Sequence, residues 1–144
     1  MIKLRKVEYS DIDLLYRWAN DPIVRKNSFN SAPISFDAHK DWFNKMMDDP
    51  SVFQFILMDE NTPVGQIRLN INGEDAEIGY SVASEYRGRG YGHKLLQLLV
   101  CLVKEDYPQI KRLIAKVKPE NSVSKELFEK EGYGMKYSCY SLEV

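Results

Sequence analysis

Residues 87–92, Arg-Gly-Arg-Gly-Tyr-Gly, constrain what this chain can fold into more than any other segment. The apolar run before them, residues 76–82, predicts a strand, and the leucine-rich run after them, residues 94–104, predicts a helix. Three glycines in five residues leave the backbone free to approach a ligand closely. The exposed N–H groups and positive dipole end at the helix start form an anion site, to which Arg87 and Arg89 add charge.

A glycine-rich turn is also typical of an ordinary tight connection, so both interpretations stay open from this segment alone. Three strand-like runs, residues 52–58, 64–71 and 76–82, are joined by turn-forming segments and predict an antiparallel meander in mid-chain. A Rossmann dinucleotide site begins on an opening βαβ unit, so the meander disfavours it. The absence of a Gly-Lys-Ser/Thr sequence excludes a P-loop.

The other elements follow from periodicity and capping signals. Ser10, with Asp13 three residues later, predicts the start of a helix that stops before Asp21-Pro22. We expect a polar loop over residues 24–33. The remaining expected elements are a strand near residues 2–7, helices at 35–48 and 121–131, a strand at 110–117, and a last strand or pair of strands at 135–142. Strands in a run that then alternate with helices predict one α/β (α+β) domain over residues 1–144, with a mixed sheet and helices on both faces.

Composition and charge argue against several classes of function. The 20 basic and 21 acidic side chains give a net charge of −1, so no general field of one sign is available to hold nucleic acid or an anionic membrane. No stretch approaches the roughly 20 apolar residues of a membrane span, and charges interrupt the N-terminus, so we expect a cytoplasmic protein. His39 and His93 lack ligand-like neighbours, so we expect no metal.

Two segments of the chain resemble a known family. Residues 77–82 followed by residues 85–92 are similar to the acetyl-CoA motif of the GNAT acetyltransferases, and residues 121–133 are similar to the second cofactor motif of that family. The resemblance implies a mixed, mostly antiparallel sheet with a splayed cofactor cleft, and acetyl-CoA as the cosubstrate. The cofactor contacts that it implies are Val82, Arg87, Gly88, Arg89, Gly90, Tyr91, Gly92, Asn121, Ser124 and Phe128.

The resemblance also implies that Glu77 is the catalytic base, which collects the proton of the amine directly or through water. In simple alternation Glu77, Gly79 and Ser81 share one face of their strand, which leaves room beside the carboxylate. The alternative is a surface glutamate with a partner. The Val82 N–H could bind the developing oxyanion. Many relatives have a tyrosine at the position of Phe128, and that tyrosine protonates the leaving thiolate. Phenylalanine cannot donate a proton, so no general acid is assigned here.

The first helices and their loop are expected to hold the acceptor. Amide and hydroxyl side chains stand there beside aromatic rings, which suits a polyhydroxylated ligand, and Arg17, Arg25 or Lys26 could meet a diphosphate. This segment is similar to GNAT enzymes that acetylate the 4-amino group of nucleotide-linked deoxy sugars in pathways to pseudaminic acid. That similarity implies an acceptor site made of Arg17, Trp18, Asn27, Ser28, Asn30 and His39.

Other functions remain open from the sequence. The acceptor could be a polyamine or a protein N-terminal amine, and a non-catalytic domain that senses acyl-CoA is a different class altogether. Trp18 and His39 also suit ordinary packing between helices. The sequence does not decide between a monomer and a homodimer, and it leaves the exact acceptor and the acyl-chain preference undetermined.

Overall fold

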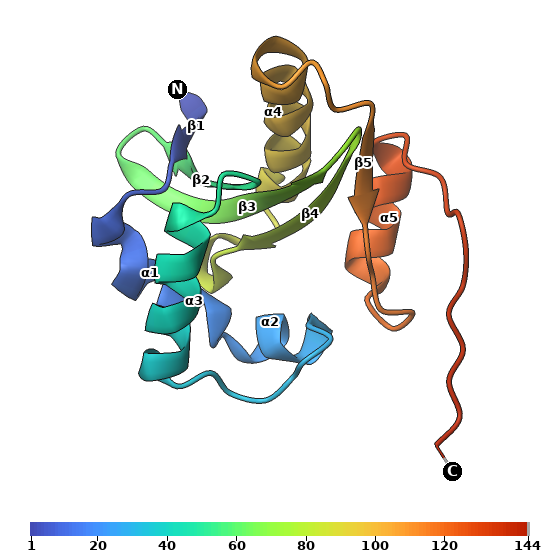
Figure 1. Ribbon diagram of the computed structural model, residues 1–144, viewed down its shortest axis with the longest axis horizontal. Helices are drawn as coiled ribbons and strands as arrows, with labels where there is room; N and C mark the ends of the chain where they lie inside the picture. Colours follow the sequence, from blue (N-terminus) through green and yellow to red (C-terminus); the bar gives the residue numbers. More distant parts are fainter. Residues whose placement is uncertain (144) are drawn as a thin grey trace.

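The computed structural model describes residues 1–143, and its elements surround one central sheet (Figure 1). Over these residues the sheet has five strands in the order β1-β2-β3-β4-β5. Neighbouring strands are antiparallel from β1 to β4, whereas β4 and β5 are parallel. The elements in chain order are β1 (Ile2–Lys6), the 3₁₀ turn η1 (Tyr9–Asp11), α1 (Ile12–Ala19), α2 (Pro22–Asn27), α3 (Phe36–Asp48), β2 (Val52–Asp59), β3 (Thr62–Asn72), β4 (Asp75–Val82), η2 (Ser84–Tyr86), α4 (Tyr91–Asp106), β5 (Arg112–Ala115) and α5 (Ser122–Lys130).

Helices cover both faces of the sheet, which confirms the predicted mixed sheet and its layers (Figure 1). On one face, the buried residues Leu96 and Leu99 of α4 and Phe128 of α5 pack on alternate residues of β2, β3 and β4. On the other face, Trp18 of α1 and Phe43 of α3 form a separate core cluster. Each fully buried side chain of this size contributes about 1.5–3 kcal/mol to folding.

The segment after α1 differs from the expected loop. Residues 22–27 form the short helix α2, because Asp21 accepts hydrogen bonds from the N–H groups of Ile23 and Val24 as an N-cap residue. Pro22 occupies the first helical position, where a missing N–H costs nothing. The pair Asp21-Pro22 therefore ends one helix and begins the next.

The first helix also begins later than Ser10 predicts. The chain makes the turn η1 before α1 begins at Ile12, and the carboxylate of Asp11 accepts a hydrogen bond from the Glu8 N–H at 2.8 Å. Asp11 thus takes the capping role that was expected of Asp13, with Glu8 in place of Ser10 at the start. Its side chain is buried and is bound at both oxygens by Arg5, at 2.8 and 2.9 Å.

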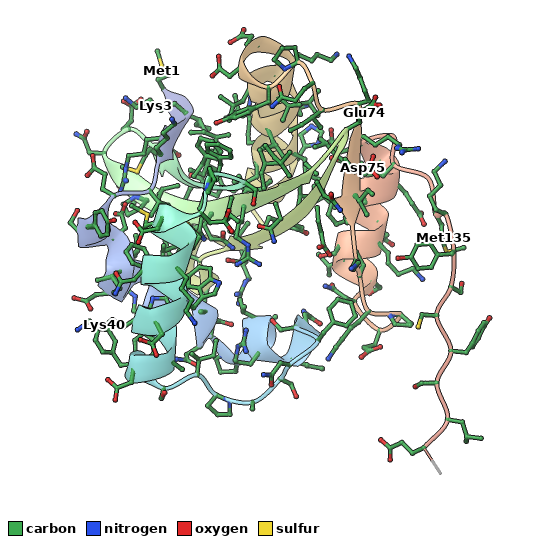
Figure 2. The ribbon with its side chains drawn as sticks, viewed as in Figure 1. Met1, Lys3, Lys40, Glu74, Asp75 and Met135 are labelled. Carbon is green, nitrogen blue, oxygen red and sulfur yellow. The ribbon has the colours of Figure 1, made fainter. Side chains whose placement is uncertain are left out.

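The expected C-terminal strand is absent from the described residues. Residues 134–143 have no regular structure, and no backbone hydrogen bond follows the one from Tyr133 to Phe128. Figure 2 places Met135 on this segment, which runs apart from the sheet. A strand needs a paired neighbour, and none lies beside these residues. The preceding strand, β5, is also shorter than the expected 110–117. Among residues 1–143, none of the helices has the length and apolar character needed to cross a bilayer.

Replacement of Asp11 by asparagine should lower stability at neutral pH by about 2 kcal/mol, the scale of a hydrogen bond to a charged group. Arg5 holds the pKa of Asp11 below its ordinary value of 3.8, although burial opposes this. The stabilisation is therefore complete above pH 3.8 and is lost as the pH falls through the lowered pKa. Denaturant unfolding from pH 7 downward should show the gap between wild type and Asp11→Asn begin to narrow once the pH falls below about 3.8. A gap that stays constant with pH would contradict this account.

Candidate active site

The strands β4 and β5 part halfway along β4. Their pairing runs only from Asp75 opposite Arg112 to Ile78 opposite Ala115, whereas β4 stays paired with β3 as far as Val82. The Ala83 N–H donates to the Val64 carbonyl at 2.8 Å, so by alternation the peptide groups of Val82 face away from β3. This half of β4 offers an unpaired backbone edge to an extended ligand. No bulge interrupts its register with β3.

The glycine loop begins α4 in the way an anion site requires. Gly88 and Gly90 have φ angles of 78° and 83°, a left-handed conformation that favours glycine, and Gly90 is the N-cap residue of α4. Gly92 lies close to α5, since a Cβ atom there would be 2.9 Å from Leu127 Cδ2, a side-chain end that would have to shift. The loop therefore presents backbone N–H groups, and α4 and α5 meet closely beside it.

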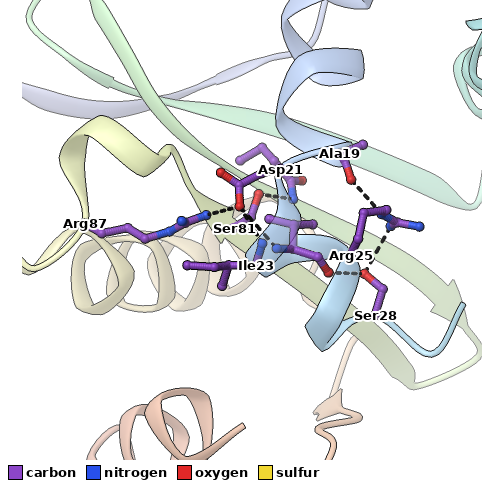
Figure 3. Close-up of polar contacts among 9 residues, drawn as sticks. Ala19, Asp21, Ile23, Arg25, Ser28, Ser81 and Arg87 are labelled. Atoms are coloured by element: carbon purple, nitrogen blue, oxygen red, sulfur yellow. Dashed lines mark hydrogen bonds and ion pairs between the residues drawn. The ribbon is translucent and has the colours of Figure 1, made fainter. Parts of the chain in front are cut away.

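The two loop arginines have protein partners. Nη2 of Arg87 lies 3.1 Å from Oδ1 of Asp21, the residue that also caps α2, as Figure 3 shows. Burial alone would raise the pKa of Asp21, but hydrogen bonds from Arg87 and from the α2 N–H groups hold it below its ordinary value. The guanidinium of Arg89 lies over the Tyr86 ring, 5.5 Å from its centre. A pyrophosphate bound by Arg87 would therefore compete with the Asp21 carboxylate for the Arg87 guanidinium.

The second cofactor motif forms α5 and its cap. The Asn121 side chain accepts a hydrogen bond from the Ser124 N–H, as an N-cap does. The Ser124 hydroxyl is 2.8 Å from that of Tyr80 on β4. Phe128 is buried and packs edge-on against the rings of Tyr80 and Tyr133. The sequence did not single out Tyr80, although its alternation with Glu77 places it on the opposite face of β4.

Tyr91, the remaining loop residue of the expected cofactor site, begins α4. Its hydroxyl donates a hydrogen bond to the Asp59 carboxylate at the end of β2. That bond raises the pKa of Tyr91, so the phenol stays protonated near neutral pH. The side chain thus anchors the start of α4 to the sheet.

Glu77, Gly79 and Ser81 share the face of β4 that α4 leaves open, as alternation predicts, since Ala76 and Ile78 are buried against α4. Oε1 of Glu77 lies 3.1 Å from Nζ of Lys116, and both side chains are about half exposed. The pairing raises the pKa of Lys116. Exposed pairs of this kind contribute only about 0–1 kcal/mol, so an incoming ammonium group can replace the lysine.

Two cavities are lined by residues of α1 and of the segment that follows it. The larger, of about 680 Å³, is lined by Tyr16 and Arg17 of α1, Pro22 and Arg25 of α2, and the residues Asn20, Ser31, Pro33 and Ile34 outside the helices. The smaller, of about 250 Å³, lies between α1 and the end of β4 and includes Val82, Ala83 and Arg87. Arg17 lines both, which places its side chain between the acceptor region and the unpaired edge of β4.

Two further residues expected at the acceptor site, Trp18 and His39, have mainly structural contacts, and only Trp18 lines a cavity. Trp18 lines the smaller cavity but packs mainly in the core, with only 6% of its surface exposed. His39 is buried, and Nε2 lies 2.9 Å from the Ile12 carbonyl oxygen, so its ring joins α1 to α3. Burial lowers the pKa of His39, which keeps the ring neutral near pH 7.

Arg25 organises the loop after α2. Its guanidinium donates to the Ala19 carbonyl and the Ser28 hydroxyl, as Figure 3 shows, and also to the Asn30 carbonyl. Ser28 donates in turn to the Val24 carbonyl at 2.6 Å. Asn27 is the last residue of α2. Arg25 itself lines the larger cavity, whereas Asn27, Ser28 and Asn30 line neither cavity.

Comparison with known proteins gives a consistent result. A family model described as an acetyltransferase (GNAT) domain matches residues 2–134. The N-acetyltransferase p20 of Bacillus licheniformis is 30% identical over 149 residues, which cover 91% of this chain and 80% of that protein.

Two solved structures share the fold. A spermidine N-acetyltransferase from Vibrio cholerae, in complex with CoA and spermine, superimposes with a TM-score of 0.83 and 23% identity, covering 91% of this chain and 79% of that one. An aminoglycoside acetyltransferase in complex with coenzyme A gives a TM-score of 0.80 and 21% identity, covering 94% and 86%.

Replacement of Gly90 by valine should weaken acetyl-CoA binding by more than about tenfold, because a branched side chain blocks the approach of backbone to phosphate. Gly73, in the β3–β4 turn, is a matched control with a φ of 64° and open space around it. Gly73→Val should cost similar stability, about 1–3 kcal/mol, without loss of affinity. Calorimetric titration of both folded variants measures the effect, and equal affinities would exclude the loop as the phosphate site.

Proposed function

We infer the activity of this chain from its family: it belongs to the GNAT acetyltransferases, and it is therefore an N-acetyltransferase that uses acetyl-CoA. We propose that the acceptor is the 4-amino group of a nucleotide-linked amino-deoxy sugar. The observation that supports this acceptor is the charge of the larger cavity. Arg17 and Arg25 line it, and no acidic residue is among its lining side chains.

Two lysines, Lys26 and Lys118, lie close to the end of α2, the helix that carries Arg25. Nζ of Lys118, on the loop after β5, donates to the carbonyl of Lys26 at the end of α2 with a distance of 2.9 Å. Cationic side chains attract phosphate oxygens, and arginine binds them with paired hydrogen bonds. A polyamine carries further ammonium groups, which these residues would repel. The charge therefore favours an anionic acceptor over the polyamine alternative, although one structural neighbour is a spermidine N-acetyltransferase.

The polar side chains of the cavity suit the sugar portion of such an acceptor. Asn20 and Ser31 line the cavity together with the ring of Tyr16. The Asn20 amide is bound at both ends to the backbone of Ile34, so it holds the cavity wall in place. An aromatic ring with hydroxyl and amide groups around it is suited to the face and the edges of a sugar.

The acetyl transfer requires three things of the protein: a proton acceptor for the amine, a donor for the carbonyl oxygen of the thioester, and a path by which the thiolate leaves. In this proposal the unpaired Val82 N–H is the donor and Glu77 is the proton acceptor. Five residues of extended strand, about 16 Å, separate these two positions. Water molecules along the polar face of β4 therefore carry the proton from the amine to Glu77. A thiol has an ordinary pKa of about 8.5, so its thiolate is already a fair leaving group and no general acid is assigned.

Replacement of Glu77 by glutamine should lower the turnover number about 100-fold near neutral pH, the usual contribution of a positioned proton acceptor. The loss should shrink at high pH, where the amine deprotonates unaided, and acetyl-CoA affinity should change little. Glu74→Gln, in the neighbouring turn, is the control and should keep full activity. If Glu77→Gln retains wild-type turnover at pH 7, the carboxylate is only a partner of Lys116. A sensing domain would show no turnover in any variant.

Acetyl transfer should proceed efficiently with a UDP-linked 4-amino-4,6-dideoxy sugar and poorly with spermidine or a short peptide. Removal of the nucleotide should reduce kcat/KM, because remote binding energy positions the reacting amine. Arg17→Gln should raise KM for the nucleotide sugar about tenfold, the cost of one charged hydrogen bond. Efficient turnover of spermidine or the peptide, with an inert nucleotide sugar, would overturn this acceptor and leave the use of acetyl-CoA intact.

A further inference from the structure

Arg68 is an arginine of β3 that the site described above does not use. Ile67 and Leu69 on either side of it are buried against the α4 face, so Arg68 points to the opposite face, where α3 lies. Its guanidinium carbon is 5.4 Å from the centre of the Trp42 ring of α3. That contact fixes the direction of a long side chain that would otherwise be free.

The strand partner of Arg68 is Gly79, in the middle of the open face of β4. A Cβ atom built on Gly79 would meet no atom within 4 Å, so the space above this residue is open. Glu77 and Ser81 flank it on the same face. The Ser81 hydroxyl accepts a hydrogen bond from the Gln66 amide at 3.1 Å, which leaves its own proton free to donate. Open space is thus bounded by an arginine, a carboxylate and a hydroxyl.

The donors of Arg68 are not used inside the protein. Within residues 1–143, its guanidinium takes part in no hydrogen bond or ion pair, although a guanidinium has five N–H donors. Burial lowers the pKa of Arg68, while the nearby charge of Glu77 acts in the opposite direction. A half-buried cation with free donors beside open space is suited to bind oxygen atoms of a ligand.

We propose that Arg68, Gly79 and Trp42 form a subsite that binds an oxygen-bearing group of the acceptor, a hydroxyl or carbonyl close to the reacting amine. The inference rests on the proposed function only in that the amine lies beside the polar face of β4. Gly79 is about 7 Å from Glu77 and from Ser81, the alternate residues on either side of it along the strand. One sugar ring bridges a span of that length. Gly79 leaves room for the ring, Arg68 donates to its oxygen, and Trp42 holds the guanidinium in place.

This subsite gives the enzyme a way to reject linear polyamines. Spermidine has no oxygen, so its binding would leave the Arg68 donors unpaired, and its distant ammonium groups would meet a cation. An amino sugar with an oxygen next to the amine satisfies the same donors. Recognition of this kind discriminates strongly, because an analogue that lacks the oxygen leaves a buried polar group without a partner.

The test compares the acceptor kinetics of Arg68→Gln with those of wild type, using thiol release from acetyl-CoA. Arg68→Gln should raise KM about tenfold or more for the UDP-linked 4-amino sugar, with a smaller change in kcat and no change in KM for acetyl-CoA. Arg68→Lys should recover part of the loss. Gly79→Val should raise the same KM by filling the open space. Arg112→Gln is the matched control, since Arg112 is an exposed strand arginine that pairs with Asp75 at the first residue of β4, the end away from Ser81.

A second acceptor separates failure of the subsite from failure of the proposed function. If the nucleotide sugar is inert but kanamycin, whose amines neighbour hydroxyl groups, is acetylated, a raised KM for kanamycin in Arg68→Gln supports the subsite while the nucleotide-sugar acceptor fails. An unchanged KM for whichever oxygen-bearing acceptor is used overturns the subsite. An equal rise in KM for spermidine would overturn it too, because the role of Arg68 would then not depend on an oxygen.

Discussion

The parting of β4 from β5 after Ile78 is the constraint on which the rest of this site depends. Because β3 continues to pair with β4 as far as Val82, only one edge of β4 is released, and that edge keeps an extended conformation. The start of α4 and the start of α5 then close around it. Gly92 of α4 lies close to Leu127 of α5, and Ser124 of α5 is hydrogen-bonded to Tyr80 of β4. An extended thioester arm can therefore pair with backbone while its phosphates reach the glycine loop.

Under the proposed function, the period of two along β4 places its two ligands on its two faces. Tyr80 faces α5 and the second cofactor motif, whereas Glu77, Gly79 and Ser81 face α1 and α3. The polar face is covered only in part, because α3 packs mainly over β2 and leaves Gly79 open. A strand with helices over both faces would normally be apolar on both sides. Under the proposed function, the polar residues in the middle of β4 serve a ligand rather than the packing of the sheet.

The sequence predicted those parts of the molecule that local signals determine. The glycine loop, α4, the meander and the Asn121 cap each depend on a few neighbouring residues. Asp21-Pro22 was interpreted only as the end of a helix, although the same two residues are good N-cap and first-helical residues, so α2 was missed. The spacing of His39 is the same whether its ring packs between helices or contacts the acceptor. Only the structure places the ring between α1 and α3. Arg68 could not be found at all, because its pairing with Gly79 depends on strand register.

A net charge of −1 and a basic acceptor region are compatible because the charges are separated within the site itself. The larger cavity has cationic lining residues and no acidic ones, whereas in the smaller cavity, beside Val82, Asp21 and Glu85 offset the charges of Arg17 and Arg87. Electrostatic effects of this kind are local, since salt screens exposed charges beyond about 8–10 Å. Under the proposed function, the diphosphate of the acceptor lies among the cations and its amine extends toward the carboxylates near the thioester. Arg17, which lines both cavities, stands at the boundary and favours that orientation over the reverse.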